Sequence, residues 1–187
     1  MTPEDVLDFW FGDDPTLFRE AWFRTDPTFD AACRARFGTV LEAARTGALD
    51  SWAETPRGTL ALVIVLDQLS RNIHRGTPDA FAADTRARAL ARAAVARGDD
   101  RRLGPLERSF LYLPFEHAED LADQAMSVRL FETLRGTYDT ADRAIEYAER
   151  HREVIRRFGR FPHRNAILGR ASTAEELAYL AEPGSGF

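Results

Sequence analysis

Signals that start and stop helices recur along the whole chain, whereas alternating β-branched segments bounded by hairpin turns are missing. At the amino terminus, Thr2 and Pro3 form an N-cap and a first-turn proline, and Gly12 can end the helix that they start. This pattern predicts an all-α fold. Because the connections are short and no serine-, proline- or glycine-rich linker divides the chain, we expect compact antiparallel helical hairpins in a single domain, residues 1–187.

The same signals predict further helices, each beginning at a capping residue or a proline and most ending near a glycine. The longest apolar run, Leu60 to Leu66, is expected to lie in a buried central helix. Pro114 is expected to interrupt the segment that begins at Pro105. The expected helices cover roughly residues 16–24, 27–47, 56–67, 77–98, 105–113, 116–134, 140–158, 162–168 and a short stretch from 173 onward.

Composition and charge argue against several classes of protein. The formal charge of −5 disfavours a general binding surface for nucleic acid or anionic membrane, and no apolar run approaches the ~20 residues of a membrane-spanning helix. The acidic amino terminus is unlike a basic signal peptide, so we expect a cytoplasmic location. Cys33 is the only cysteine, which rules out an internal disulfide, and its apolar neighbours favour a packed thiol over a nucleophile.

Polar residues follow the central apolar run without a break. Leu60, Ile64, Asp67 and Arg71 share one helical face, so a carboxylate and a guanidinium extend an apolar stripe. Asp67 and Arg71 are four residues apart and can pair, which lessens the cost of removing them from water. Two interpretations stay open for this segment, a structural ion pair and a functional site that also uses the nearby amides of Gln68 and Asn72.

Two histidines fall on apolar stripes of their predicted helices. His117 is in register with Leu121, Gln124, Val128 and Phe131, and His151 shares a stripe with Ala144, Ala148, Ile155 and Phe158. A lone histidine on such a face is more often a satisfied core residue than a functional one. Two of them, together with Asp67 and Arg71, favour a shared polar pocket in which the carboxylate orients a histidine for acid–base chemistry.

The segment Arg156 to Asn165, RRFGRFPHRN, alternates arginines with aromatic residues. Every basic residue of the chain is an arginine, so only clusters of arginines are informative. Pro162 is expected to start a short helix through Leu168, whose free amides would attract an anion. The segment is interpreted either as an anion-binding corner or as a clamp closed by acidic side chains; the residues concerned are Arg160, His163, Arg164 and Asn165.

Familiar catalytic motifs are missing. The chain contains no GxxxxGK[ST] phosphate loop, no GxGxxG dinucleotide motif, no HExxH and no GxSxG. Several possible ligands could meet in space, but their spacing is no metal signature, so neither a metal nor a cofactor is expected; they are His117, Glu119, Asp120 and His151.

Four segments resemble the bacterial family of unknown function DUF924. They are VLDFWFG near the start, LALVIVLDQLSRNIHRG from Leu60, FLYLPFEHAEDLADQ from Phe110, and HREVIRRFGRFPHRNAILGRAST from His151. The resemblance covers nearly the whole chain. It implies an all-helical, tetratricopeptide-like arrangement of hairpins, although no internal repeat is visible in the sequence.

This chain departs from the family pattern at two places. Ala118 stands where family members commonly have serine in HSED, so a hydroxyl at that position cannot serve this protein. Leu69 and Ser70 give LDQLSRN in place of the commoner LDQFPRN. Neither change touches Asp67 or Arg71, and the resemblance implies no particular reaction.

Two functions of different classes fit these residues. The first is a small-molecule enzyme whose substrate is anionic or contains an amide; among such enzymes the residues favour a hydrolase, with water as the nucleophile. Asp67 would orient a histidine, His117 or His151 would move the proton, and the substrate would be held by Gln68, Arg71, Asn72, Arg160, His163, Arg164 and Asn165. The alternative is a helical interaction module that grips a peptide or protein carboxylate. A closed pocket containing both histidines favours the enzyme, and an open groove with the histidines apart favours the module.

Overall fold

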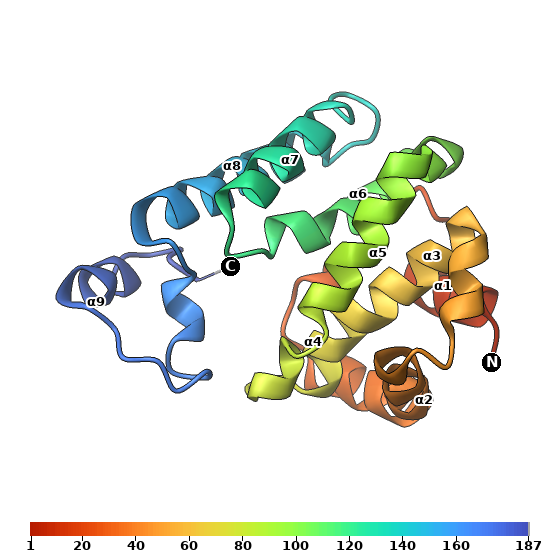
Figure 1. Ribbon diagram of the computed structural model, residues 1–187, viewed down its shortest axis with the longest axis horizontal. Coiled ribbons are helices and arrows are strands. Elements are labelled where there is room, and N and C mark those ends of the chain that lie inside the picture. Colours follow the sequence, from red (N-terminus) through yellow and green to blue (C-terminus); the bar gives the residue numbers. More distant parts are fainter. Residues whose placement is uncertain (187) are drawn as a thin grey trace.

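The chain folds into helices, and the computed structural model, which describes residues 1–186, contains no β-strand in that range (Figure 1). The predicted all-α class is therefore confirmed. Short 3-10 turns join many of the elements. The α-helices are α1 (Pro3–Phe11), α2 (Pro27–Thr46), α3 (Pro56–Val63), α4 (Ser70–Ile73), α5 (Asp84–Arg97), α6 (Pro105–Glu116), α7 (Leu121–Glu132), α8 (Ala141–Phe158) and α9 (Ala174–Leu180).

Several helices begin and end at the residues that the sequence indicates. Asp26 caps α2 by accepting hydrogen bonds from the backbone amides at positions 28 and 29, and Thr2 and Thr173 form capping boxes at α1 and α9. Gly47 and Gly159 follow α2 and α8 with φ of 86° and 71°, a left-handed conformation that favours glycine.

The central helix runs from α3 through a π-helical segment, Ile64–Leu69, into α4. Its residues are almost completely buried from Gly58 to Ser70, because α1, α2, α5 and α6 pack around it. Next to this layer, α6, α7 and α8 form consecutive antiparallel hairpins (Figure 1). The arrangement is compatible with a tetratricopeptide-like description. Cys33 is fully buried, as expected for a packed thiol.

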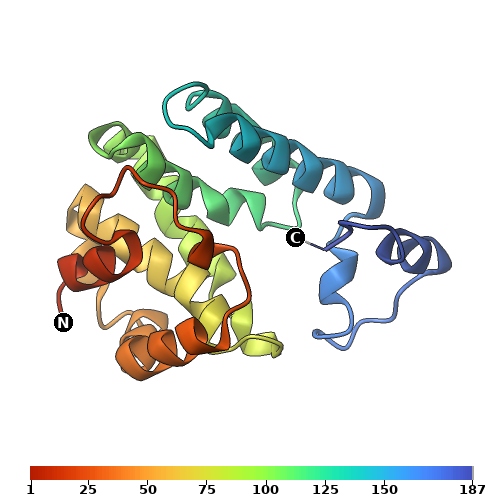
Figure 2. The same ribbon diagram turned by 180° about the vertical axis from the view of Figure 1, so that it is seen from behind.

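The connection between α1 and α2 crosses the front of the molecule in Figure 2. A helix was expected over residues 16–24, but only Glu20–Trp22 form a 3-10 turn. The segment is held by aromatic packing instead of helical hydrogen bonds, because the Trp22 ring lies 4.8 Å from Phe110 and 6.1 Å from Trp10. It therefore acts as a strap across helices that are distant in sequence.

The predicted boundary at Pro114 is wrong. The proline lies inside α6, which continues to Glu116, and His117 is the residue that ends this helix. The next helix starts at Leu121 and not at Glu116, because the Asp120 side chain accepts two backbone hydrogen bonds and caps it.

Two further boundaries differ from the prediction. The helix expected from residue 77 begins as a 3-10 turn, Pro78–Ala80, and α5 itself starts at Asp84. The helix expected over residues 162–168 is a 3-10 turn, Pro162–Arg164, followed by further turns. Each of these prolines starts a helical turn, but the turn does not propagate into an α-helix.

Candidate functional site

The π-helical segment of the central helix carries the most buried charge of the molecule. Asp67 is fully buried, and its carboxylate lies 2.8 Å from Nδ1 of His117, 2.6 Å from Nε2 of Gln68 and 3.1 Å from Nη1 of Arg71. Burial alone would raise the pKa of Asp67, but the charge of Arg71 and the hydrogen bonds from His117 and Gln68 keep it below its ordinary value. The group is therefore an ionised carboxylate held by three side chains.

His117 lies at the carboxyl end of α6, where Nδ1 of its ring contacts the carboxylate of Asp67. Since the carboxylate can only accept, Nδ1 of the ring carries the hydrogen, and Nε2 is the basic nitrogen of the neutral form. Burial lowers the pKa of His117, and the neighbouring Asp67 opposes this shift. The inward orientation was expected, but the predicted helix register behind that expectation was wrong, because His117 lies outside α7.

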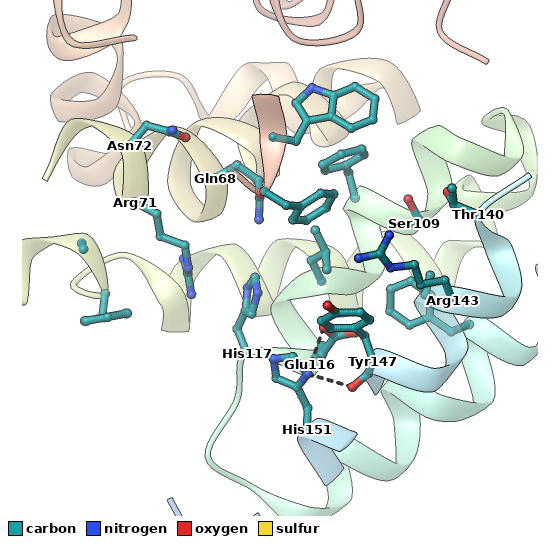
Figure 3. A pocket seen from close by; sticks show the side chains of 18 of the residues that line it. Gln68, Arg71, Asn72, Ser109, Glu116, His117, Thr140, Arg143, Tyr147 and His151 are labelled. Atoms are coloured by element: carbon teal, nitrogen blue, oxygen red, sulfur yellow. Dashed lines mark hydrogen bonds and ion pairs between the residues drawn. The ribbon is translucent and has the colours of Figure 1, made fainter. Parts of the chain in front are cut away.

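His151 approaches the same place from α8, and the two imidazole rings lie 6.4 Å apart (Figure 3). Its Nδ1 is 2.8 Å from the backbone carbonyl of Tyr147, an acceptor, which fixes the hydrogen on Nδ1. Burial holds the pKa of His151 well below its ordinary value. The ring is therefore neutral near pH 7.

Glu116 is a member of this cluster that the sequence analysis missed. Oε1 of its carboxyl group lies 3.3 Å from Nδ1 of His151, and the residue is almost fully buried. Burial and the charge of Asp67 raise the pKa of Glu116 to about 8, so it holds a proton at neutral pH. A signal was present, since Glu116 is an acidic residue in the last turn of an apolar helix, where the helix dipole disfavours negative charge.

Asp84, at the start of α5, was also missed. Both of its carboxylate oxygens lie 3.0 Å from the guanidinium of Arg71, which also donates to the backbone carbonyl of Asp67. The predicted pair of Asp67 and Arg71 is present, but it is part of a longer network that joins the central helix to α5. Arg71 is thereby shared by two carboxylates.

Arg164 completes the network. Its guanidinium lies between the rings of Phe81 and Phe161, 4.8 and 4.5 Å from their centroids, and donates to the carbonyl of His117 at 3.0 Å. Burial and the charge of Arg71 lower the pKa of Arg164 to about 10. Within the described chain, its Nε has no hydrogen-bond partner.

Most of these groups line a cavity of about 460 Å³, whereas Asp67 and Asp84 do not form part of its wall. A second cavity of about 320 Å³ has Phe81, His117 and Arg164 in its wall as well. Of the residues proposed from the sequence, the larger cavity is lined by Gln68, Arg71, Asn72, His117, His151, His163 and Arg164. Asn72 lines the larger cavity, and Nδ2 of its side-chain amide donates a hydrogen bond to Asp30 at 2.8 Å.

Arg160 and Asn165 lie away from this cavity, in a cluster that we call the Glu176 clamp. The guanidinium of Arg160 donates to both carboxylate oxygens of Glu176 at 2.6 and 2.8 Å, and Nδ2 of Asn165 donates to Ser172 at 3.0 Å and Glu176 at 3.3 Å. A protein carboxylate thus occupies the place proposed for an external anion. The clamp interpretation describes Arg160 and Asn165, whereas His163 and Arg164 face the cavity.

Within residues 1–186, no three or more histidine, cysteine, aspartate or glutamate side chains are placed to hold one metal ion. None of the helices in this range is both long enough and apolar enough to cross a membrane.

Comparison with known proteins places this arrangement in a family. The family model described as bacterial protein of unknown function (DUF924) matches residues 6–184. The chain belongs to this family. Among solved structures, this DUF924 member is similar to the protein of unknown function ATU0120 from Agrobacterium tumefaciens, with 41% sequence identity over 96% of both chains and a TM-score of 0.87. No curated protein matches it.

Proposed function

We propose that this protein is a small-molecule hydrolase whose substrate contains an amide or an anionic group, with His117 as the general base. The observation that carries the proposal is the contact of 2.8 Å between the buried carboxylate of Asp67 and His117, which lines a cavity of about 460 Å³. Cavities of this size are typical of small-molecule sites.

The protonation states of the two residues suit this role. His117 is neutral near pH 7, so Nε2 can take a proton from water, and the buried carboxylate of Asp67 stabilises the imidazolium that forms. The water oxygen would form a bond to the substrate carbonyl carbon, the carbon–nitrogen bond would break, and the leaving amine would take up a proton. Glu116 is protonated at neutral pH and lies next to His151. It is therefore a second source of a proton for the leaving amine, in addition to the imidazolium of His117.

The surroundings of His117 supply positive charge and space for water. Arg71 and Arg164 lie on the cavity wall, where guanidinium groups can stabilise an oxyanion. His117 also lines the second cavity, which offers space for water next to this residue. The alternative of an interaction module is less well supported, since it expects the histidines to be packed apart in an open groove.

The proposal is tested by screening the purified protein against amides, lactams, esters and phosphate esters. An activity should appear with the wild type and fall by about 10²–10⁴-fold in His117→Gln, the usual contribution of a general base. His74→Gln is the matched control, because His74 is half-buried at the carboxyl end of the central helix and lines neither cavity. Absence of turnover in every class, or full activity of His117→Gln, would contradict the proposal.

A further inference from the structure

Part of the lining of the larger cavity follows α6. The residues that α6 contributes to it recur every three or four positions and lie on one face of the helix; they are Leu106, the adjacent pair Ser109 and Phe110, Leu113 and Glu116. At 1.5 Å per residue this face extends over about 15 Å. Helix α8 runs beside it, with Thr140 and Arg143 near Ser109 at one end and His151 near Glu116 at the other (Figure 3).

The two ends of the cavity differ in chemistry. The histidine end contains Gln68, Arg71, Glu116, His117 and His151. The other end, which we call the aromatic end, contains Phe18, Trp22, Phe23, Phe110 and Phe131, together with the polar side chains of Ser109, Thr140 and Arg143. Leu113 lies between them on the same face of α6.

The rings of the aromatic end come mainly from the strap between α1 and α2. Phe23 stacks on Phe110 with centroids 6.2 Å apart, and Phe18 stacks on Phe23 at 5.9 Å. Phe18 and Phe23 nevertheless remain 39% and 61% exposed. Large aromatic side chains that are exposed beside a cavity are typical of surfaces that bind apolar groups.

We infer that the substrate is an amide with an apolar acyl chain, which lies along α6 with its carbonyl at the histidine end and its tail at the aromatic end. The inference rests on the proposed function, which places the carbonyl at His117. A small polar amide would fill only part of a cavity of about 460 Å³ and would leave the aromatic end without a partner. Lining residues that follow α6 over about 15 Å leave room for an extended chain.

Binding of straight-chain carboxylates from two to ten carbons tests the inference, because these are the acid products of such amides. Calorimetry and the fluorescence of Trp22, which lines the aromatic end, report binding without requiring turnover. We expect the affinity to rise about fourfold for each added methylene until the cavity is filled. Alkylamines of equal length should bind more weakly, because the carbonyl end of the site contains Arg71 and Arg164.

Two variants test where the alkyl chain of the ligand binds. Ala144→Phe adds a ring at a partly buried position of the cavity wall and should remove the gain with chain length. Phe23→Ala should reduce it by removing an exposed ring of the aromatic end, so it remains informative if Ala144→Phe does not fold. Leu177→Ala is the matched control, since Leu177 is 58% exposed on α9 and lines neither cavity.

The outcomes separate this inference from the proposed function. An affinity that does not change with chain length, or that changes equally in the wild type and Ala144→Phe, overturns the inference, even if short amides are hydrolysed. An affinity that rises with chain length and falls in both cavity variants supports the acyl ligand, and in that case failure to hydrolyse any N-acyl amide would count against the hydrolase alone.

Discussion

Two clusters of arginine and carboxylate groups can be compared in this protein, the Glu176 clamp and the network around Asp67. In the clamp, Arg160 and Asn165 both donate to one glutamate, and neither side chain lines a cavity. In the network, Asp67 and Arg71 contact His117 and Asp84, and three of these four residues lie in the wall of a cavity. Similar side chains thus serve to join chain segments in one place and to line or support a cavity in the other.

The largest change in the free energy of unfolding is expected when Arg71 is removed from the buried network. Arg71→Ala leaves the carboxylates of Asp67 and Asp84 without their shared cation, and we expect a loss of about 3–5 kcal/mol in the free energy of unfolding. Urea denaturation measures it. Arg75→Ala is the control from the next turn, since its pair with Asp30 is more exposed and should contribute at most about 1 kcal/mol. Equal losses in the two variants would contradict the buried network.

The pH dependence of stability should distinguish the buried carboxyl group of Glu116 in the cavity wall from an exposed carboxylate. The pKa of Glu116 is raised to about 8, so its contribution to stability is fully present below about pH 4.5 and is lost as the pH rises through 8, with a slope of at most about 1.4 kcal/mol per pH unit. In Glu116→Gln this part of the decline should disappear. Denaturation midpoints between pH 4.5 and 8 measure it, and Glu132→Gln, on the exposed surface of α7, should keep the wild-type slope. An unchanged slope in Glu116→Gln would show that the carboxyl group is ionised.

The smallest effect is expected in the clamp. Arg160→Ala removes one partner of Glu176, but hydrogen bonds from Asn165 and the amide of Thr173 remain, so we expect a smaller loss in the free energy of unfolding than Arg71→Ala causes. Arg157→Ala, whose partner is the exposed Glu175, should change stability by less than about 0.5 kcal/mol. Titration of phosphate and small carboxylates should give the same affinity for Arg160→Ala as for the wild type. Weaker binding by Arg160→Ala would restore the anion-binding interpretation of this corner.

Local signals in the sequence predicted much of the fold but less of the site. Caps such as Asp26 and glycines such as Gly47 act within a few residues, so the ends of α2 could be predicted. Asp67 could be selected because it extends an apolar stripe. Asp84 could not be selected, because its partner Arg71 is 13 residues away and only the packing of α5 brings them together.

The clamp shows a second limit of local reasoning. The alternation of arginines and aromatic residues around Pro162 indicates a binding surface equally well for an external anion and for an internal one. The choice between them depends on Glu176, which lies in the first turn of α9. It contacts Arg160 because the chain folds back between the two residues. His117 illustrates the converse, since its inward orientation was predicted from a helix to which it does not belong.

The π-helical segment Ile64–Leu69 has a consequence for the angular phase of the central helix. A π turn holds about one residue more than an α turn, so the residues after it are delayed by about 100° relative to an uninterrupted α-helix. The part of the central helix before this segment presents apolar residues to its neighbours on every side. The part after it has a different angular phase, in which Arg71 and Asn72 line the cavity. Deleting one residue from this segment would rotate the second half as a unit, which makes the length of this helix, and not only its composition, a determinant of the site.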